Sequence, residues 1–207
     1  KENLTLGTNK EYSNIMRNIS KELCQRAENL ASSAKLNSNQ SLEIQNQTRK
    51  AETALNENAY YSAASYCFGN SVALRKILYE NMSEAKVQSK AAQLKQDIKR
   101  FEDTINSAEI KTIPGLQTFS IVSERINEAK NSLGDDVDQS KLAYSEERFF
   151  SARAWSKFFA MGGKEFVIST SVLANSCNEK IQEAQERLEY LKLFLPESFI
   201  NIGEDIK

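Results

Sequence analysis

Residues 83–106 read SEAKVQSKAAQLKQDIKRFEDTIN, and the apolar positions of this stretch decide the fold class. Val87 begins a seam whose members are spaced alternately four and three residues apart, namely Ala91, Leu94, Ile98, Phe101 and Ile105. This spacing places all of the apolar side chains on one face of an α-helix. Ser83 is a suitable N-cap, and Glu84 is favourable at the positive end of the helix dipole. The stretch therefore predicts a long amphipathic helix.

Three further stretches carry helical stripes. One begins after Thr8-x-x-Glu11, which has the spacing of a capping box, and one lies between Pro114 and Gly134. The last repeats the spacing of the first seam from Cys177 onward and ends before Pro196. In chain order, the stripes consist of Tyr12, Met16, Ile19, Leu23, Ala27, Leu30 and Ala34; Phe119, Val122, Ile126, Ala129 and Leu133; and Cys177, Ile181, Ala184, Leu188, Leu191 and Leu195.

The composition agrees with an all-α fold and restricts the chemistry. The 207 residues include 7 Gly and 2 Pro, fewer than a turn-rich β-sandwich or a phosphate-binding α/β fold needs. Histidine is absent, which removes the commonest general base and metal ligand. The net charge of -1 excludes the strongly basic surface typical of nucleic-acid-binding proteins. No apolar run approaches the roughly 18 residues of a membrane span, so we expect no transmembrane segment.

An internal repeat indicates duplication. Residues 54–66 (ALNENAYYSAASY) align with residues 143–155 (AYSEERFFSARAW) at an offset of 89, and the seams from Val87 and Cys177 align at an offset of 90. We therefore expect one helical domain, residues 1–207, built from a duplicated four-helix unit of long antiparallel helices, as a bundle or a tetratricopeptide-like array. The two copies cover about 9–110 and 114–196, and a short tail covers 197–207. The second copy would place a linker and a short helix between Gly134 and Glu146.

The aromatic residues of the repeat are the candidate partner groove. A short turn near residues 56–58 would join two helices, and the small Ser62 and Ala63 would let them approach closely. Neighbouring residues of a helix point about 100° apart, so one ring of each doublet is expected in the core and the other is free. Core packing of the two doublets is the favoured interpretation, and a groove for a peptide or another helix is the alternative. The set consists of Tyr60, Tyr61, Tyr66, Phe149, Phe150 and Trp155.

The cysteines and acidic clusters indicate no metal, cofactor or catalytic site. Cys24, Cys67 and Cys177 are widely spaced without a C-x-x-C pair, so we expect buried thiols, with a single disulfide as the alternative. The acidic clusters at 135–138 and 146–147 lack the spacing of a calcium loop and are expected at solvated helix starts. No serine lies in a G-x-S-x-G elbow. We therefore expect no enzymatic activity within this chain.

Five Asn-x-Ser/Thr sequons lie within the first 83 residues, at Asn3, Asn18, Asn39, Asn46 and Asn81. Such sequons accept glycans in proteins that leave the cytoplasm. They favour a glycoprotein in an extracytoplasmic or membrane-associated setting, and a cytoplasmic protein is the alternative.

Two segments carry a family resemblance. Residues 3–34 (NLTLGTNKEYSNIMRNISKELCQRAENLASSA) and 59–78 (AYYSAASYCFGNSVALRKIL) resemble the helical C-terminal region of predicted archaeal serine proteases of the Lon-like type. The resemblance implies a Ser–Lys protease domain upstream of a long helical region, in an exported or membrane-associated protein. The catalytic Ser and Lys of that family belong to the upstream domain, so the resemblance carries no catalytic residue over to this chain.

These observations favour a non-catalytic helical module for interaction or assembly, carried by a larger exported protease-like protein. The expected partner is a protein or a peptide. A free-standing helical adaptor or scaffold is the alternative, and self-association through the heptad faces remains open.

Overall fold

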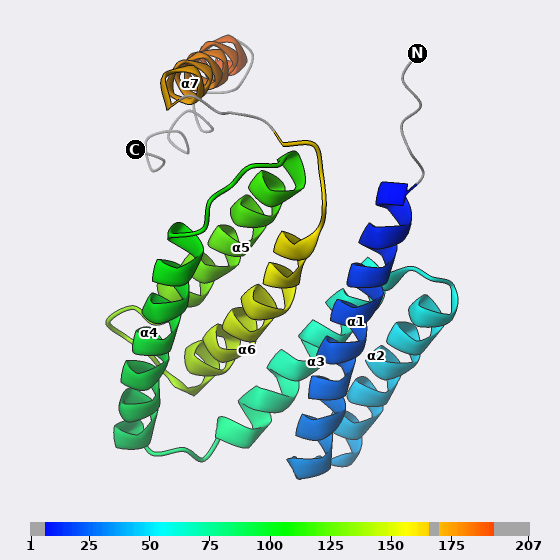
Figure 1. Ribbon diagram of the computed structural model, residues 1–207. Helices are drawn as coiled ribbons and strands as arrows, with labels where there is room; N and C mark the ends of the chain where they lie inside the picture. The colour runs from blue at the N-terminus through cyan, green and yellow to red at the C-terminus, as the bar shows by residue number, and fades with distance from the viewer. Residues whose placement is uncertain (1–6, 166–169, 193–207) are drawn as a thin grey trace. The chain divides into compact units, whose positions relative to one another are not determined.

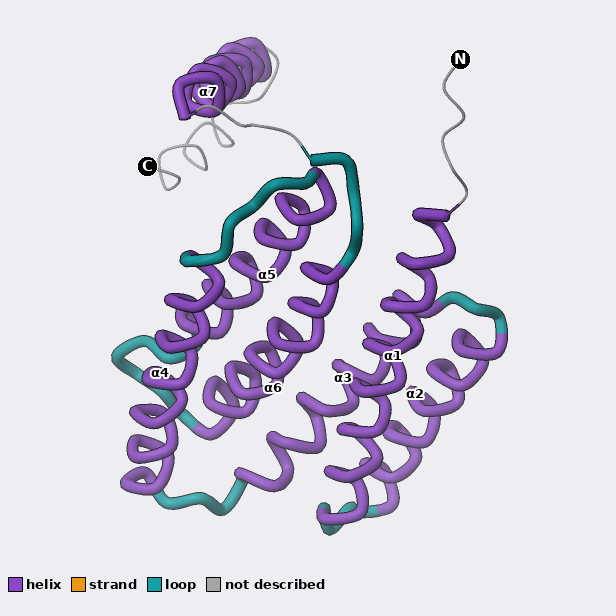
Figure 2. The backbone as a smooth tube through the Cα atoms, in the orientation of Figure 1, coloured by secondary structure: helices purple, strands orange, loops and turns teal. Residues whose placement is uncertain are grey.

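The computed structural model describes residues 7–165 and 170–192, and it confirms the all-α fold class. Figure 1 shows the helices in chain order, and Figure 2 shows the loops between them. The chain divides into two compact units, residues 1–165 and 166–207. The regular elements of the described part are α1 (Gly7–Ser33), α2 (Ser38–Asn56), α3 (Tyr60–Tyr79), α4 (Glu84–Asn106), α5 (Ile113–Asn131), α6 (Gln139–Trp155), the 3-10 helix η1 (Ser156–Ala160) and α7 (Thr170–Lys192).

Side-chain hydrogen bonds cap three of the described helices, α2, α5 and α6. Asn37 caps α2 in a capping box with Gln40, with hydrogen bonds of 2.9 and 3.0 Å. Pro114 lies in the first turn of α5, as the sequence predicts, and Thr112 caps this helix by accepting a hydrogen bond from the backbone N–H of Gly115 at 3.1 Å. Ser83 occupies the N-cap position of α4, although its side chain makes no capping bond. These starts agree with the residue types that favour helix N-termini.

The predicted capping box at Thr8 is wrong. Helix α1 begins at Gly7, so Thr8 lies inside the helix rather than at its N-cap. Oε1 of Glu11 accepts a hydrogen bond from the backbone N–H of Gly162 at 3.3 Å instead. Glu11 therefore contacts the loop after η1 and does not close a capping box.

The first unit consists of two groups of three helices that meet along α3 and α6. Helices α1 and α2 both pack on α3, α5 pairs with α6, and α4 packs on both α5 and α6 (Figure 1). The Val87 seam of α4 is buried except for the half-buried Phe101, as predicted. The predicted stripes of α1 and α5 supply Ile19, Leu23 and Val122 to the same core.

The two aligned segments of the internal repeat have different structures. Residues 54–66 cross a turn in which Asn58 has a φ of 60°, and the backbone N–H of Ala59 bonds to the carbonyl of Ala54 at 2.8 Å. This arrangement ends α2, because Asn tolerates the left-handed region. Glu147 occupies the aligned position in the second segment, where α6 continues without a turn. The short helix expected before Glu146 is therefore absent, because residues 132–138 form a loop and α6 begins at Gln139.

The seam from Cys177 does not form a buried face within the described residues. Cys177, Ile181 and Ala184 lie on α7 as the spacing predicts, but their side chains are exposed. Hydrophobic spacing sets which face of a helix is apolar and does not by itself provide a neighbour to cover that face. Leu195 and Pro196 lie outside the described residues.

Candidate functional site: a groove between two helices

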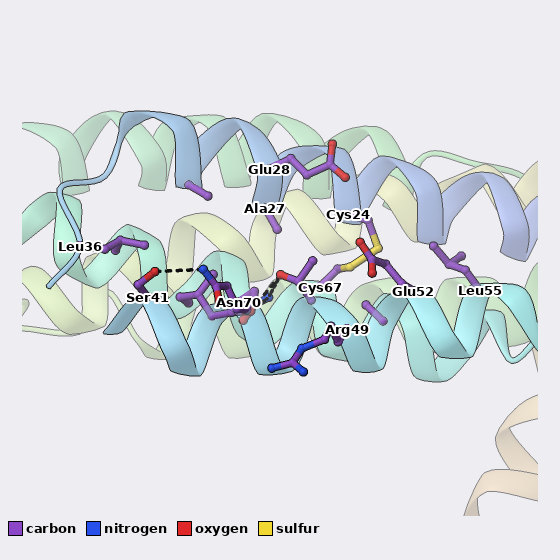
Figure 3. Close-up of a pocket in the computed structure, with 15 residues that line it drawn as sticks. Cys24, Ala27, Glu28, Leu36, Ser41, Arg49, Glu52, Leu55, Cys67 and Asn70 are labelled. Atoms are coloured by element: carbon purple, nitrogen blue, oxygen red, sulfur yellow. Dashed lines mark hydrogen bonds between the residues drawn. A yellow bond between two sulfur atoms is a disulfide. The ribbon is translucent and has the colours of Figure 1, made fainter. Parts of the chain in front are cut away.

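A cavity of about 600 Å³ lies between α1 and α2 above α3, and we call it the α1–α2 groove (Figure 3). Its buried floor consists of Cys24, Ala27, Ile44, Ala51, Cys67 and Asn70. Exposed charged side chains, Glu28, Arg49 and Glu52, line its rim. The groove therefore combines an apolar floor with a charged edge, which is typical of a surface that binds another molecule.

The sequence of α2 explains why the groove stays open. Ile44 is the only large hydrophobic side chain among the buried residues of this helix, and the others are Ala51 and Ala54. On the opposite wall, Ala27 and Ala31 of α1 are equally small. Side chains this short cannot fill the space between two helices that both pack on α3. The two helices consequently frame a trough and make little contact with each other.

A disulfide between Cys24 and Cys67 fixes the floor of the groove. The two Cα atoms lie 4.8 Å apart, and 43 residues separate the cysteines in sequence. Buried free thiols were the expectation for these residues, and that prediction is wrong. Helix α1 packs closely along α3, so the two side chains meet, and cysteine spacing in the sequence carries no signal for this pairing. Cys177 is an exposed free thiol rather than a buried one.

Polar contacts join α2 to α3 at one end of the floor. Nδ2 of the buried Asn70 donates to Oγ1 of Thr48 at 3.2 Å and to the carbonyl of Ile44 at 3.4 Å. Oγ1 of Thr48 in turn donates to the carbonyl of Ile44 at 2.9 Å. Gln45 bonds to Ser41 on the same helix. These bonds hold α2 at a fixed position on α3 and leave the groove unobstructed.

The predicted aromatic set does not form one groove. Tyr60 packs against the core and donates to Asn58, while the ring of Tyr61 is 61% exposed. Phe149 is buried and Phe150 half-buried. In each doublet one ring is therefore more buried than the other, as the 100° angle between neighbouring side chains of a helix predicts.

The aromatic residues lie on different sides of the helices. Tyr61 meets the buried Trp155 edge-on, with ring centroids 6.0 Å apart. Phe150 lies under the guanidinium of Arg26, and Tyr66 faces Lys50 on α2. Of the predicted set, the structure thus places only Tyr61 and Trp155 in ring contact across α3 and α6.

Glu146 and Glu147 do not lie at a solvated helix start, so that expectation is wrong. Both residues lie in the middle of α6, and the side chain of Glu147 is only 1% exposed. Its carboxylate accepts from Nε and Nη2 of Arg26 at 2.6 and 2.9 Å and from Nε of Arg75 at 2.7 Å. Glu147 thus joins α6 to α1 and α3, because bidentate pairing compensates the cost of burying its charge.

Glu146 extends this charge cluster. Its carboxylate accepts a hydrogen bond from the hydroxyl of Tyr79 on α3. Burial and the contact with Glu146 together hold the pKa of Tyr79 well above its usual range. Burial alone would lower the pKa of Arg75, but the charges of Glu146 and Glu147 outweigh it and raise that pKa. The cluster joins the two helix groups, because carboxylates on α6 pair with side chains on α1 and α3.

The acidic residues at 135–138 do lie before a helix. Oδ1 of Asp138 caps α6 by accepting from the backbone N–H of Lys141 at 2.7 Å, and Asp135 and Asp136 are exposed. In the described part of the chain, no three His, Cys, Asp or Glu side chains are close enough to hold a metal ion.

Four of the five predicted glycosylation sites are exposed, and Asn3 lies outside the described residues. Asn18 lies on α1, Asn39 and Asn46 lie on α2, and Asn81 lies in the loop before α4. Within residues 7–165 and 170–192, no helix combines the length and apolar character needed to cross a bilayer.

The sequence pattern did not reveal the α1–α2 groove. Ala27 belongs to the predicted stripe of α1, but nothing in the spacing shows that its neighbouring helix is too polar to cover it. The detectable signal is the scarcity of large apolar residues in residues 38–56. Comparisons with protein-family models, with curated proteins and with solved structures gave no match for this chain.

Proposed function

We propose that this chain is a non-catalytic helical interaction module whose α1–α2 groove binds an amphipathic helical segment of a protein partner. The observation that carries this proposal is the trough of about 600 Å³ with its buried apolar floor and charged rim. A groove of this kind holds the apolar face of a helix through side chains spaced three and four residues apart.

The dimensions of the groove favour a helical segment. Along α2 its lining residues run from Ser41 to Leu55, which corresponds to about 20 Å at 1.5 Å per residue. The small side chains of Ala27, Ala31 and Ala51 allow a third helix to approach as closely as helices do in protein cores. The rim carries two carboxylates, Glu28 and Glu52, and one guanidinium, so basic residues are expected beside the apolar face of the partner.

The setting of the module is an extracytoplasmic compartment. A disulfide between Cys24 and Cys67 persists where the environment is oxidising, and the exposed sequons on α1 and α2 are accessible to glycosylation. We assign the module to a larger exported protease-like protein on the resemblance of residues 3–34 and 59–78 alone. A free-standing adaptor would have the same groove, but its native chain would be lighter than that of the larger protein.

A selection from a displayed library of amphipathic helical peptides tests the binding function. The folded protein should enrich peptides with apolar residues at helical spacing and flanking basic residues. Ala31→Phe should abolish binding of the selected peptides, because the new ring would occupy the groove. Ala85→Phe, on an exposed position of α4, is the matched control and should bind like the wild type. Enrichment of no peptide, or equal binding by the Ala31→Phe variant, would contradict the proposal.

A further inference from the structure

A second, smaller cavity of about 70 Å³ lies where α3 meets α5 and α6, apart from the α1–α2 groove. Its polar lining residues all carry hydrogen-bond donors, and they are Tyr61, Ser65, Arg125, Arg148 and Ser151. No carboxylate lines it. Leu23, Phe68 and Trp155 are among its apolar walls. A small cavity with this lining is complementary to an anion.

Arg125 lacks the partner that a partly buried guanidinium normally has. Its Nη1 donates to the carbonyl of Ile121 at 3.2 Å, and its buried Nε finds no acceptor among the described residues. No carboxylate of the described part lies within salt-bridge distance of it, whereas Arg148 pairs with Glu128. Burial and the nearby charge of Arg148 lower the pKa of Arg125. The charges of Glu124 and Glu128 act on Arg125 in the opposite direction, but neither carboxylate lines the cavity, where the two guanidinium groups are the charged side chains.

Aromatic rings hold both arginines in position. The guanidinium of Arg125 lies 4.4 Å from the ring centroid of Trp155, and that of Arg148 lies 5.4 Å from the ring of Phe68. Such contacts limit the freedom of the side chains before any ligand arrives. Binding an anion would therefore cost little ordering of the site.

We propose that this cavity is a binding site for a small phosphate-class oxyanion. Guanidinium groups bind phosphate through paired N–H donors, and the three hydroxyls supply further donors. A water-sized probe needs about 10–15 Å³, so the cavity has room for one such group and not for a nucleotide. The 61% exposed Tyr61 lines the cavity, so the organic part of a phosphate ester would extend past it into solvent. This site does not depend on the proposed groove function.

The chain contains one tryptophan, and Trp155 lines this cavity, so its fluorescence reports on the site directly. We expect potassium phosphate, titrated against potassium chloride at constant ionic strength and pH, to give a saturable change in emission. We also expect a rise in Tm of about 3–8 °C at saturation. The same titration with glycerol phosphate distinguishes a free ion from an ester, because tighter binding of glycerol phosphate identifies an organic phosphate as the ligand class.

Arg125→Met keeps the aliphatic stem against Trp155 and removes the charge. This variant should lose both phosphate responses, because the guanidinium that would meet the oxyanion is gone. Arg153→Met, on the exposed face of α6, is the matched control and should respond like the wild type. An equal response of the wild type to chloride would overturn the proposal, and this comparison does not require the variant to fold. A phosphate response that persists in Arg125→Met would also overturn it.

Discussion

At the scale of single residues, the Cys24–Cys67 pair decides how firmly α1 is fixed to α3. The bond closes a loop across 43 residues of sequence and lies at the floor of the α1–α2 groove. A disulfide stabilises a fold mainly by restricting the unfolded chain, and more so for longer loops. The bond therefore adds covalent closure to the packing of α1 on α3 beneath the groove.

We expect the Cys24→Ala/Cys67→Ala double variant to lose roughly 2–4 kcal/mol of unfolding free energy. Urea unfolding of both proteins without reductant measures this difference. Cys177→Ala is the control and should be neutral, because its thiol is exposed. Equal urea midpoints for the double variant and the wild type would show that the bond does not constrain the fold.

Glu128 gives the fold an acid-sensitive contact between α5 and α6. Partial burial would raise its pKa, but the hydrogen bonds from Arg148 and Tyr144 and the charges of Arg148 and Arg125 outweigh burial, so the pKa is lowered. A carboxylate with a lowered pKa in the folded state stabilises the fold above its unfolded pKa, and this stabilisation is lost as the pH falls through the folded pKa.

Glu128→Gln should therefore be less stable than the wild type at pH 7, and this difference should shrink as the pH falls toward 3. Urea midpoints at the two pH values give the comparison, because the stabilisation by a carboxylate with a lowered pKa is lost progressively below its unfolded pKa. A stability difference that stays constant between pH 7 and pH 3 would contradict the assignment.

At the scale of elements, amphipathic spacing predicted α1, α4 and α5 well, because each has one apolar face that the core covers. It predicted nothing about which elements meet. Glu147 pairs with Arg26 and Arg75, which lie 121 and 72 positions away in the sequence. Because the sequence does not show these partners, a carboxylate in the middle of a helix is expected to face solvent. The two aligned segments of the repeat differ for a local reason, because Asn58 permits a turn where the aligned Glu147 continues the helix.

The Glu147 cluster should be a main support of the contact between the two helix groups. We expect Glu147→Gln to cost about 3–5 kcal/mol, since it leaves two partly buried guanidinium groups without their carboxylate. Asp103→Asn removes an exposed ion pair with Lys99 and should cost less than about 1 kcal/mol. Chemical denaturation of the two variants provides the test, and similar costs for both would argue against a supporting role for Glu147.

At the scale of the whole molecule, composition predicted the all-α fold but not the groove. The low numbers of glycine and proline and the long apolar heptad patterns disfavour every other fold class. The groove arises because α2, which has few large apolar side chains, packs on α3 without covering α1. This arrangement depends on how the three helices pack together and not on the pattern of any single helix. The proposed oxidising setting rests on the Cys24–Cys67 bond, and this pairing becomes visible only when the fold brings the two residues together.

The native protein from its source cells should carry the Cys24–Cys67 link and glycan on at least one of Asn39 and Asn46. Non-reducing peptide mapping detects the link, and intact mass detects both glycan and any chain beyond these 207 residues. Reduced cysteines in a bare chain of 207 residues would instead indicate a free-standing cytoplasmic adaptor.

Hydrogen–deuterium exchange of the protein with and without a selected amphipathic peptide tests binding at the α1–α2 groove most sharply. We expect slower exchange in residues 24–31 of α1 and 41–55 of α2, the two walls of the groove, and no such change in Ala31→Phe. Protection confined to other helices, or protection that persists unchanged in Ala31→Phe, would contradict a binding role for the α1–α2 groove.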